Sequence, residues 1–369
     1  MYYIGLMSGT SADAIDAAVV DIPASGRPRL LGSHQAPLPQ EIRAAIHELV
    51  SPSPDEIERM GRLGVRLGRH FARAALAVME IGRIARPEIR AIGCHGQTIR
   101  HKPDGPEPYT LQIGEPAIVV EETGITTVAH FRSRDLAAGG EGAPLVPAFH
   151  QAVFRSSAAT RVVINIGGIA NATFLPKDQS QPVTGFDIGP GNTLLDQWIN
   201  KHRNLPLDRN GEWARTGRVD PNLVKRFLTD PYFSRHAPKS TGREYFNLEW
   251  LIAALGDGPS AAPEDVQASL AQLTVESIAQ TLARNHPGGP HEIYLCGGGA
   301  KNLFLVEALT RRLAPMPVRP TDALGFPAQS VEAAAFAWLA HQTMEGRPGN
   351  LPEVTGARHP VVMGAIYRA

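Results

Sequence analysis

The amino-acid sequence predicts an α/β protein built from two related halves. Two stretches, Ile4–Ile22 and Val162–Leu175, repeat one pattern: an apolar strand, a Gly-rich polar turn and a second apolar strand. The length of 369 residues and the hydrophobic content of 43% are sufficient for two buried cores. Glycines in each turn let backbone N–H groups approach a ligand closely, and hydroxyl or amide side chains add polar groups suited to phosphate oxygens. The repeat therefore predicts a duplicated fold that closes on one nucleotide.

The composition is that of an ordinary globular chain. Lys plus Arg and Asp plus Glu each total 36, so no basic face for nucleic acid or anionic membrane is indicated. Only Cys94 and Cys296 are present, which excludes a disulfide framework, and no Cys/His spacing resembles a zinc site. The first residues do not resemble a secretion signal, and no apolar run reaches the roughly 18 to 20 residues of a membrane span. We therefore expect a cytoplasmic protein.

The first half, expected as a domain over 1–150, starts with a strand meander. Strands are predicted near 2–8, 15–22 and 29–36, followed by an amphipathic helix from Pro54 to about Arg83. The later segment IGCHGQT predicts a buried strand and a turn, and the Gly-rich segment RSRDLAAGGEGAPL is long enough to suggest a functional loop.

The second half restarts the pattern near Ser156 and is expected as a domain over 151–369, although the last helix can cross back to the first domain. A strand is predicted to end at Phe186 or Asp187, before a Gly-Pro-Gly turn and a helix from Asn192. Further elements are expected as a helix over 263–285, a strand in EIYLC, a helix through Leu313 and a helix from Ser330 to about His341, with an irregular tail after Gly346.

The first turn offers groups suited to a terminal phosphate and its magnesium ion. Thr10 and Ser11 supply hydroxyls, and Asp13 or Asp16 can hold hydrated Mg²⁺. The alternative is a hairpin turn whose Gly, Ser and Asp serve geometry alone. Recurrence of the pattern near Asn165 favours the phosphate interpretation.

Three consecutive glycines, Gly297, Gly298 and Gly299, follow a strand and open a helix. A loop without side chains lets an adenine or a ribose lie against the backbone. The segment lacks both the GxGxxG spacing and the lysine of GxxxxGK[ST], so neither a Rossmann dinucleotide site nor a P-loop is supported.

Asp187 is the candidate general base, since a carboxylate at a strand end beside a phosphate site can accept a proton from water or a hydroxyl. Its alternative role is to cap the helix that begins near Asn192. In the first half, His95 is a candidate for acting on the substrate, but it is equally consistent with a structural hydrogen bond. Arg132, Arg134 and Asp135 suit a substrate carboxylate or hydroxyl groups, but a solvated loop explains them nearly as well.

Glu332 is the carboxylate least suited to a purely surface role, because its neighbours in SVEAAAFAWLA are predicted to be buried. Its alternative explanation is the preference of acidic side chains for the first turn of a helix.

Together these segments closely resemble the anhydro-N-acetylmuramic acid kinases, members of the sugar kinase, actin and Hsp70 superfamily. The resemblance extends in order over nearly the whole chain, and it is carried by the strings GLMSGTSADAID, AIGCHGQTIRH, LQIGEPA, FRSRDLAAGGEGAPLVPAFH, NIGGIAN, GFDIGPGN, PKSTGREYFN, LCGGGAKN and EAAAFAWLA.

The resemblance implies two actin-like (ribonuclease H-like) domains with a nucleotide cleft between them. It also implies ATP- and Mg²⁺-dependent opening of the 1,6-anhydro ring of 1,6-anhydro-N-acetylmuramic acid, with phosphorylation of O6, in recycling of cell-wall sugar. By motif position Asp187 activates the attacking water. A homodimer is a further expectation of the family.

The resemblance also assigns binding residues. The ATP phosphates are expected on the first loop and on the second hairpin, at Gly9, Thr10, Ser11, Ala12, Asp13, Ala14, Ile15, Asp16, Asn165, Gly167 and Gly168. The nucleoside is expected at Gly297, Gly298 and Gly299, and Mg²⁺ on Asp13 through water. The amino sugar is expected at His95, Gln97, Thr98, Arg132, Asp135, Gly189, Gly191 and Glu332.

Three positions depart from the family pattern: Ala14 replaces Gly, His130 replaces Asp and Glu141 replaces Gln. A methyl group at position 14 costs roughly 1 to 2 kcal/mol if that residue needs a positive φ. Two other function classes stay open on the residues alone. One is a kinase-fold protein that binds nucleotide without turnover, and the other is a kinase of an ordinary sugar hydroxyl whose product gains no water.

Overall fold

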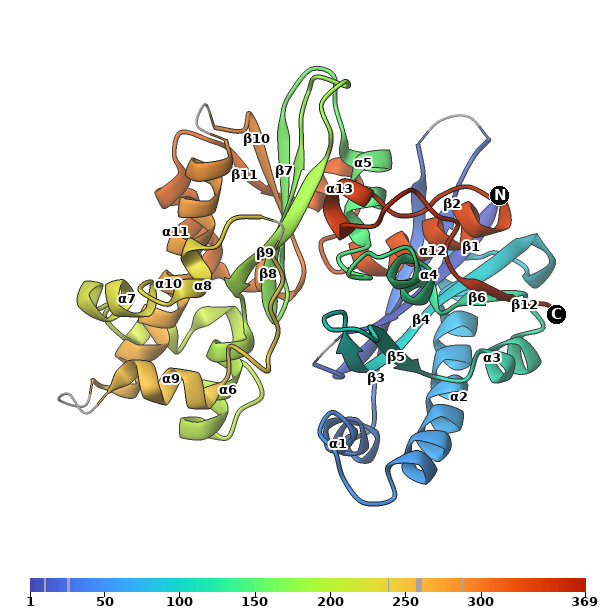
Figure 1. Cartoon of the computed structure of the whole chain (residues 1–369), viewed down its shortest axis with the longest axis horizontal. Coiled ribbons are helices and arrows are strands. Elements are labelled where there is room, and N and C mark those ends of the chain that lie inside the picture. The colour runs from blue at the N-terminus through green and yellow to red at the C-terminus, as the bar shows by residue number, and fades with distance from the viewer. Residues whose placement is uncertain (10, 25–26, 238, 257–260, 287–288) are drawn as a thin grey trace. The chain divides into compact units, whose positions relative to one another are not determined.

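The computed structural model describes residues 1–9, 11–24, 27–237, 239–256, 261–286 and 289–369 (Figure 1). The chain forms two compact units, one made of Met1–Val153 with Gln329–Ala369 and the other of Phe154–Ala328. The first change of unit lies close to the expected boundary near residue 150. The second unit ends at Ala328, however, and not at residue 369 as the expected C-terminal domain did, because the last long helix and the tail pack on the first unit.

The first unit contains a seven-stranded mixed sheet in which β1, β2 and β3 form the expected antiparallel meander. Strand β4 pairs parallel to β1, and β6 pairs parallel to β4, which gives the order β12-β6-β4-β1-β2-β3 with β5 on β4. The strands are β1 Tyr2–Ser8, β2 Ala14–Asp21, β3 Arg29–Pro37, β4 Ile89–Lys102, β5 Tyr109–Ile113, β6 Thr127–Ala129 and β12 Ala365–Tyr367.

The second unit repeats this topology with five strands in the order β11-β10-β7-β8-β9. Again a meander of three antiparallel strands is followed by two strands parallel to the first. The strands are β7 Arg161–Ile166, β8 Ile169–Leu175, β9 Thr184–Pro190, β10 Glu292–Cys296 and β11 Val318–Pro320. The shared strand order confirms the predicted duplication of a ribonuclease H-like, or actin-like, α/β fold.

Helices complete both units. Those of the first unit are α1 Gln40–Leu49, α2 Glu56–Gly82, α3 Pro116–Thr123, α4 Phe131–Ala137, α5 Val146–Phe154, whose last residue opens the second unit, α12 Val331–Met344 and α13 Pro352–Thr355. Those of the second are α6 Thr193–Arg203, α7 Pro221–Phe227, α8 Pro231–Ser234, α9 Leu248–Leu255, α10 Pro263–Asn285 and α11 Leu303–Leu313. The bounds of α10 agree with the prediction.

The predicted apolar stripe of α2 forms one side of the core of the first unit. Residues Leu63, Leu67, Phe71, Ala75 and Val78 recur at three- or four-residue spacing, and all are buried. Because this spacing keeps them on one helix face, the helix can lie along the sheet with its charged face outward. The expected helix therefore forms for the reason that its periodicity gives.

On α12, small residues let the helix approach the sheet of the first unit unusually closely. Strand residues Gly5 and Gly93 lie directly beneath it, where an added Cβ would be 1.7 Å from the Ala333 carbonyl oxygen and 2.0 Å from that of Phe336. No other residue type fits at these two positions. The glycine pair and the Ala-rich helix therefore explain why the end of the chain returns to the first unit.

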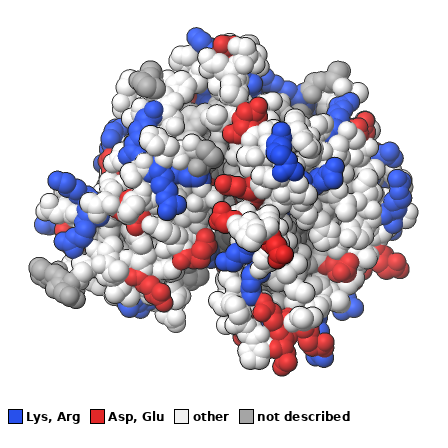
Figure 2. All heavy atoms as spheres, in the orientation of Figure 1, with Lys and Arg blue, Asp and Glu red and all other residues white. Residues whose placement is uncertain are grey.

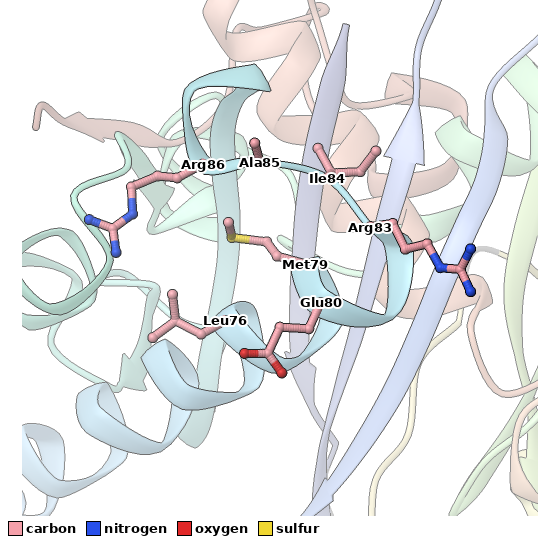
Figure 3. A pocket seen from close by; sticks show the side chains of 7 residues that line it. All are labelled: Leu76, Met79, Glu80, Arg83, Ile84, Ala85 and Arg86. Atoms are coloured by element: carbon pink, nitrogen blue, oxygen red, sulfur yellow. The ribbon is translucent and has the colours of Figure 1, made fainter.

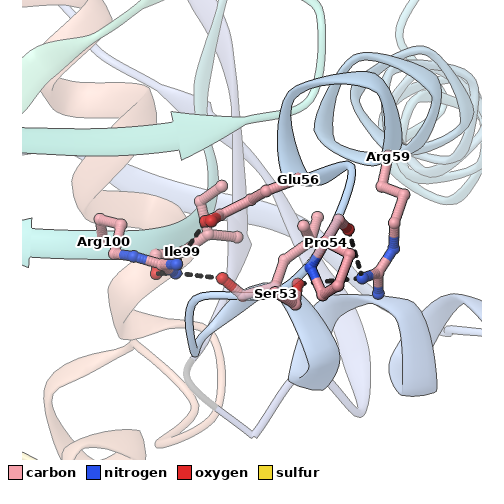
Figure 4. Close-up of polar contacts among 7 residues, drawn as sticks. Ser53, Pro54, Glu56, Arg59, Ile99 and Arg100 are labelled. Carbon is pink, nitrogen blue, oxygen red and sulfur yellow. Dashed lines mark hydrogen bonds and ion pairs between the residues drawn. The ribbon is translucent and has the colours of Figure 1, made fainter.

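Helix α1 was not predicted from the sequence, and its loop to α2 is fixed by an arginine of the sheet. The Arg100 side chain, on β4, donates to the carbonyl oxygens of Ile99 and Leu49 and pairs with Glu56 at the start of α2 (Figure 4). The Arg100 side chain is only 12% exposed. Its partners therefore compensate for the water that the guanidinium charge loses on burial.

Surface charge agrees with the balanced composition. On the face in Figure 2, basic and acidic side chains are interspersed, with no broad patch of one sign. Cys94 and Cys296 are both buried free thiols. None of the helices in the described part of the chain combines the length and apolar character needed to cross a bilayer.

Replacement of Gly93 by Ala should destabilise the first unit by about 3 kcal/mol, because the methyl group forces α12 away from β4. The matched control is Gly61→Ala on the exposed face of α2, where an added Cβ meets no atom within 4 Å. That control should gain about 0.5 to 1 kcal/mol, since Ala favours helix over Gly. Urea denaturation of both variants measures the difference, and equal stability of the two would contradict the close packing.

Candidate active site

The first Gly-rich turn, between β1 and β2, closes a regular hairpin in which Ser8 opposes Ile15. The N–H of Ala12 donates to the Gly9 carbonyl oxygen at 3.1 Å, and Ala12 has a φ of 54°. Thr10 lies outside the described residues. Ala14 is the first residue of β2, and the left-handed conformation belongs to Ala12. The conditional penalty expected at position 14 therefore does not arise.

The carboxylates of this hairpin each have a partner. Asp13, whose side chain is 58% exposed, pairs with Arg43 of α1 at 3.3 Å. Asp16 accepts a hydrogen bond from the Gln35 amide at 2.9 Å. Ile15 is fully buried between its two neighbouring strands, so neither its side chain nor its backbone is exposed to a ligand. Within the described ranges no group of three or more His, Cys, Asp or Glu residues could hold a metal ion.

In the second unit, the structure brings the β7–β8 turn into contact with the turn before α6. The Gly168 carbonyl oxygen accepts from the N–H groups of Gly191 and Thr193, at 2.9 and 3.0 Å, while the Gly167 carbonyl accepts from Asn192 at 2.8 Å. An added Cβ at Gly191 would lie 2.4 Å from the Gly167 oxygen. Two predicted binding segments, distant in sequence, therefore form one backbone-lined structure.

The three glycines after β10 join the same edge of the sheet but differ in their roles. At Gly297, with a φ of 80°, an added Cβ would lie 2.2 Å from Asn165 Oδ1, and at Gly299 it would lie 2.3 Å from Ile166. Gly298 is exposed, and the nearest atom to an added Cβ is 3.6 Å away. Two of the three glycines are thus needed for packing against β7, and Gly298 leaves backbone accessible.

Asp187 lies inside β9 and not at its end, and three neighbours hold it. Its N–H donates to the Lys239 carbonyl at 3.1 Å, its carbonyl accepts from the Tyr232 hydroxyl at 2.8 Å, and its carboxylate accepts from the Thr241 N–H at 3.1 Å. Helix α6 begins only at Thr193, so the alternative that Asp187 caps that helix is wrong.

Lys239 is a neighbour of Asp187 that sequence reasoning did not assign to the site. Its Nζ lies 4.5 Å from the centre of the Tyr232 ring, and burial lowers the pKa of Lys239 to about 8 against the opposing attraction of Asp187. The segment that carries it was noted only as a family-like string. Its proximity to Asp187 could not be seen from the sequence because the two residues lie on different elements.

In the first unit, His95 and Arg132 form a buried hydrogen-bonded pair. His95 lies within β4, where a turn was predicted, and its Nε2 accepts from Arg132 Nε at 3.0 Å while Nδ1 donates to the Gly96 carbonyl at 2.8 Å. Burial lowers the pKa of His95 well below its usual value, and the Arg132 charge lowers it further. The imidazole is therefore neutral, with its proton on Nδ1.

Arg132 connects this pair to Glu332 and to the Gly-rich loop. Burial lowers the pKa of Arg132 to about 10, whereas the charges of Glu332, in the first turn of α12, and Asp135 act in the opposite direction. Its Nη1 donates to the Gly142 carbonyl at 2.8 Å. These bonds account for two of the five guanidinium N–H donors, so Arg132 suits recognition of an oxyanion.

Other predicted sugar-binding residues make contacts within the protein. Asp135 is fully buried and Gln97 is 1% exposed, with its Oε1 accepting from the Ser8 hydroxyl at 2.6 Å. Thr98 accepts from the Gln112 amide at 3.1 Å. In the second unit, an added Cβ at Gly189 would lie 2.7 Å from the Phe233 ring. Each of these residues is therefore held by packing or hydrogen bonds, and contact of Gln97, Thr98 and Gly189 with the sugar stays a prediction.

A surface hollow of about 480 Å³ occurs elsewhere in the first unit, at the C-terminal end of α2 (Figure 3). Its lining contains none of the predicted site residues and consists of Leu76, Met79, Glu80, Arg83, Ile84, Ala85 and Arg86.

Strand order and the paired Gly-rich hairpins place both units in the actin-like (ribonuclease H-like) fold class. The chain belongs to the anhydro-N-acetylmuramic acid kinase family, whose model matches residues 1–369. This finding confirms the predicted family and enzyme class.

Named relatives agree over nearly the full length. An anhydro-N-acetylmuramic acid kinase of Coxiella burnetii is 48% identical over 365 residues, 99% of this chain and 97% of the relative. Those of Nitrosospira multiformis and Shewanella oneidensis are 48% and 46% identical over 368 residues, 100% of this chain and 99% of each relative.

Among solved structures, component A of (R)-2-hydroxyglutaryl-CoA dehydratase from Acidaminococcus fermentans aligns with a TM-score of 0.46 and 13% identity, over 92% of this chain and 98% of that one. The assignment of the fold rests on the strand order of the two sheets.

Two residues that are expected to depart from the family pattern lie near the two ends of α4. His130 has a φ of 57° before the helix, and its Nε2 lies 3.1 Å from the Tyr367 hydroxyl. Glu141 follows the helix, and its N–H donates to the Thr355 carbonyl at 2.7 Å.

The free energy of unfolding should fall as pH falls from 7 to 5. Burial lowers the pKa values of His95, His101 and His150, that of His150 to about 3, so these side chains are neutral in the folded protein. Once unfolded they titrate near 6.5, so the stability present above that pH is lost as pH falls toward the folded pKa.

The variant His150→Leu should lower this pH slope by up to about 1.4 kcal/mol per pH unit. Urea denaturation at several pH values measures the slope, with His359→Leu as the control at an exposed histidine. A slope that His150→Leu leaves unchanged would show that His150 does not gain a proton on unfolding.

Proposed function

We propose that the chain uses ATP to open the anhydro ring of 1,6-anhydro-N-acetylmuramic acid and to phosphorylate O6, with Asp187 as the general base. The single observation that carries the assignment of Asp187 is its fixation on β9, with a carboxylate oriented by the Thr241 N–H. A base must be held in place to accept a proton in the transition state.

In the proposed reaction, ring opening releases the oxygen that then accepts the phosphoryl group. Water attacks the anomeric carbon and gives a proton to Asp187 while the bond from that carbon to O6 breaks. The released O6 attacks the γ-phosphorus of ATP, the bond to the bridging oxygen breaks, and ADP leaves. The product is N-acetylmuramic acid 6-phosphate, which contains one phosphoryl group and one water more than the substrate.

Backbone groups of the Gly-rich turns are proposed to bind the nucleotide. In the second unit these are the turn at Gly167 and Gly168 and the loop at Gly298, which expose little side chain. In the first unit, Asp13 is exposed enough to exchange its 3.3 Å pairing with Arg43 for a water bound to Mg²⁺. Mg²⁺ bound there would neutralise negative charge that develops on the phosphates during transfer.

Arg132 and Glu332 are proposed to contact the amino sugar. His95, whose two ring nitrogens are bonded to Gly96 and Arg132, is proposed to hold the guanidinium in place. A guanidinium recognises the lactyl carboxylate by paired hydrogen bonds, and Glu332 accepts from hydroxyl or amide groups. Asp135 is fully buried, so we assign it a positioning role in place of the direct contact expected from the resemblance. Gly189 and Gly191 stay predicted sugar contacts.

Location and assembly are the remaining proposals. Two buried free thiols suit a reducing compartment, so we place the protein in the cytoplasm. The homodimer implied by the resemblance stays a prediction.

Substitution of Asp187 by Asn should lower kcat about 10²- to 10⁴-fold, because the amide cannot accept the proton from water. Mass spectrometry of reactions with Mg-ATP and the anhydro sugar follows the product. Asp178→Asn, in an exposed turn of the same unit, is the matched control and should keep full activity. If the wild-type protein gave a product heavier by phosphoryl alone, it would be an ordinary hydroxyl kinase. If the wild-type protein bound ATP without forming any product, it would be a silent regulator.

Substitution of Gly298 by Ala tests the nucleoside position. The methyl group has room in the protein, so the free energy of unfolding should change by less than about 0.5 kcal/mol. KM for ATP should rise about tenfold, because the methyl group separates the nucleoside of ATP from the backbone. Steady-state kinetics and urea denaturation provide the two readouts. An unchanged KM for ATP would place the nucleoside elsewhere.

A further inference from the structure

The tail after α12 contains two buried polar residues that bond to α4. Asn350 and Thr355 are 5% and 1% exposed. The Asn350 amide donates to Asp135 Oδ1 at 2.7 Å, and the Thr355 hydroxyl donates to the same oxygen at 2.8 Å. Asn350 is itself fixed, because its Oδ1 accepts from the Val361 N–H at 2.8 Å. The tail therefore supplies side-chain donors to a carboxylate far away in sequence.

The second oxygen of Asp135 connects this contact to the Gly-rich loop. Asp135 Oδ2 accepts from the Gly142 N–H at 2.8 Å, and the Gly142 carbonyl accepts from Arg132 Nη1 at 2.8 Å. The loop must pass close to the carboxylate, since an added Cβ at Gly140 would lie 2.3 Å from Oδ2. A continuous series of hydrogen bonds thus joins the tail to Arg132 and, through Nε, to His95.

Burial makes each of these donors necessary. A fully buried carboxylate is unfavourable unless protein donors replace the water it has lost, and hydrogen bonds to a charged acceptor are short and strong. Asp135 therefore adopts the one position at which Asn350, Thr355 and Gly142 all reach it. That position fixes Gly142, and Gly142 in turn limits where the Arg132 guanidinium can lie.

We propose that Asn350 and Thr355 are positioning residues for the amino-sugar site, acting through Asp135 and Gly142 on Arg132. The inference rests on the proposed function in one respect, namely that Arg132 binds the sugar. Loss of a tail donor lets the loop move and misaligns the guanidinium. The consequence is weaker sugar binding with unchanged nucleotide binding.

The variant Thr355→Val keeps the side-chain shape and removes the hydroxyl donor. We expect KM for the anhydro sugar to rise about tenfold, the equivalent of one such hydrogen bond, with KM for ATP unchanged. Thr355→Ser restores the donor and should restore KM. Asn350→Ser removes the other donor and should act in the same direction should Thr355→Val not fold.

The control is Thr123→Val, at a fully buried threonine of α3 in the same unit. Its hydroxyl donates to the Val119 carbonyl at 2.6 Å and accepts from the Ile125 N–H at 3.2 Å, away from the Asp135 series. This variant should lose stability without a change in KM for the sugar. Equal sugar KM values for Thr355→Val and Thr123→Val, or a failure of Thr355→Ser to recover, would overturn the proposal.

An NMR measurement that needs no catalytic turnover tests the positioning role independently of the proposed function. In protein labelled with ¹⁵N-arginine, the Arg132 Nε–H bonded to His95 should give a slowly exchanging NMR signal, assigned by its loss in Arg132→Lys. The signal should exchange faster in Thr355→Val but not in Thr123→Val. An unchanged signal would overturn the positioning role even in an active enzyme. Accelerated exchange in a protein that does not phosphorylate the sugar would support positioning while refuting the proposed function.

Discussion

Close packing of α12 on the sheet is the constraint on which the first unit depends. The backbone of this helix reaches the strands because Gly5 and Gly93 have no side chains and because its contact face is largely Ala. The contact has three consequences. It returns the chain to the first unit after Ala328, it places Glu332 near Arg132, and it brings the tail within reach of α4. A larger residue at either strand position would disturb all three together.

The proposed nucleotide site and the proposed sugar site are built from different groups. In the second unit, backbone groups form the proposed nucleotide-binding surface, and carbonyl oxygens of Gly167 and Gly168 join separate turns into one structure. In the first unit, charged and titratable side chains are buried and held by one another. His95 stays neutral because burial opposes its charge, so it can accept a hydrogen bond from Arg132, whose own charge is compensated by Glu332 and Asp135.

Several predicted site residues are already bonded within the protein. Asp135 and Gln97 are buried and bonded to protein groups, although their residue types suit a sugar. Residue type alone could not distinguish these roles, because a carboxylate that binds a hydroxyl and one that binds a backbone N–H need the same chemistry. Burial decides between them. Lys239, in contrast, was not predicted as a site residue but lies near Asp187 in the structure. Nothing in its local sequence indicates that proximity.

The sequence by itself determined both hairpins, the apolar stripe of α2 and the bounds of α10, because these depend on periodicity and turn residues over short distances. It also determined the family, through motifs that extend over the whole chain. Only the tertiary structure decided that the tail packs on α4 and that Asp187 lies within a strand. The physical reason is distance along the chain: Asn350 and Asp135 are 215 residues apart, so their hydrogen bond exists only after α12 has packed on the sheet.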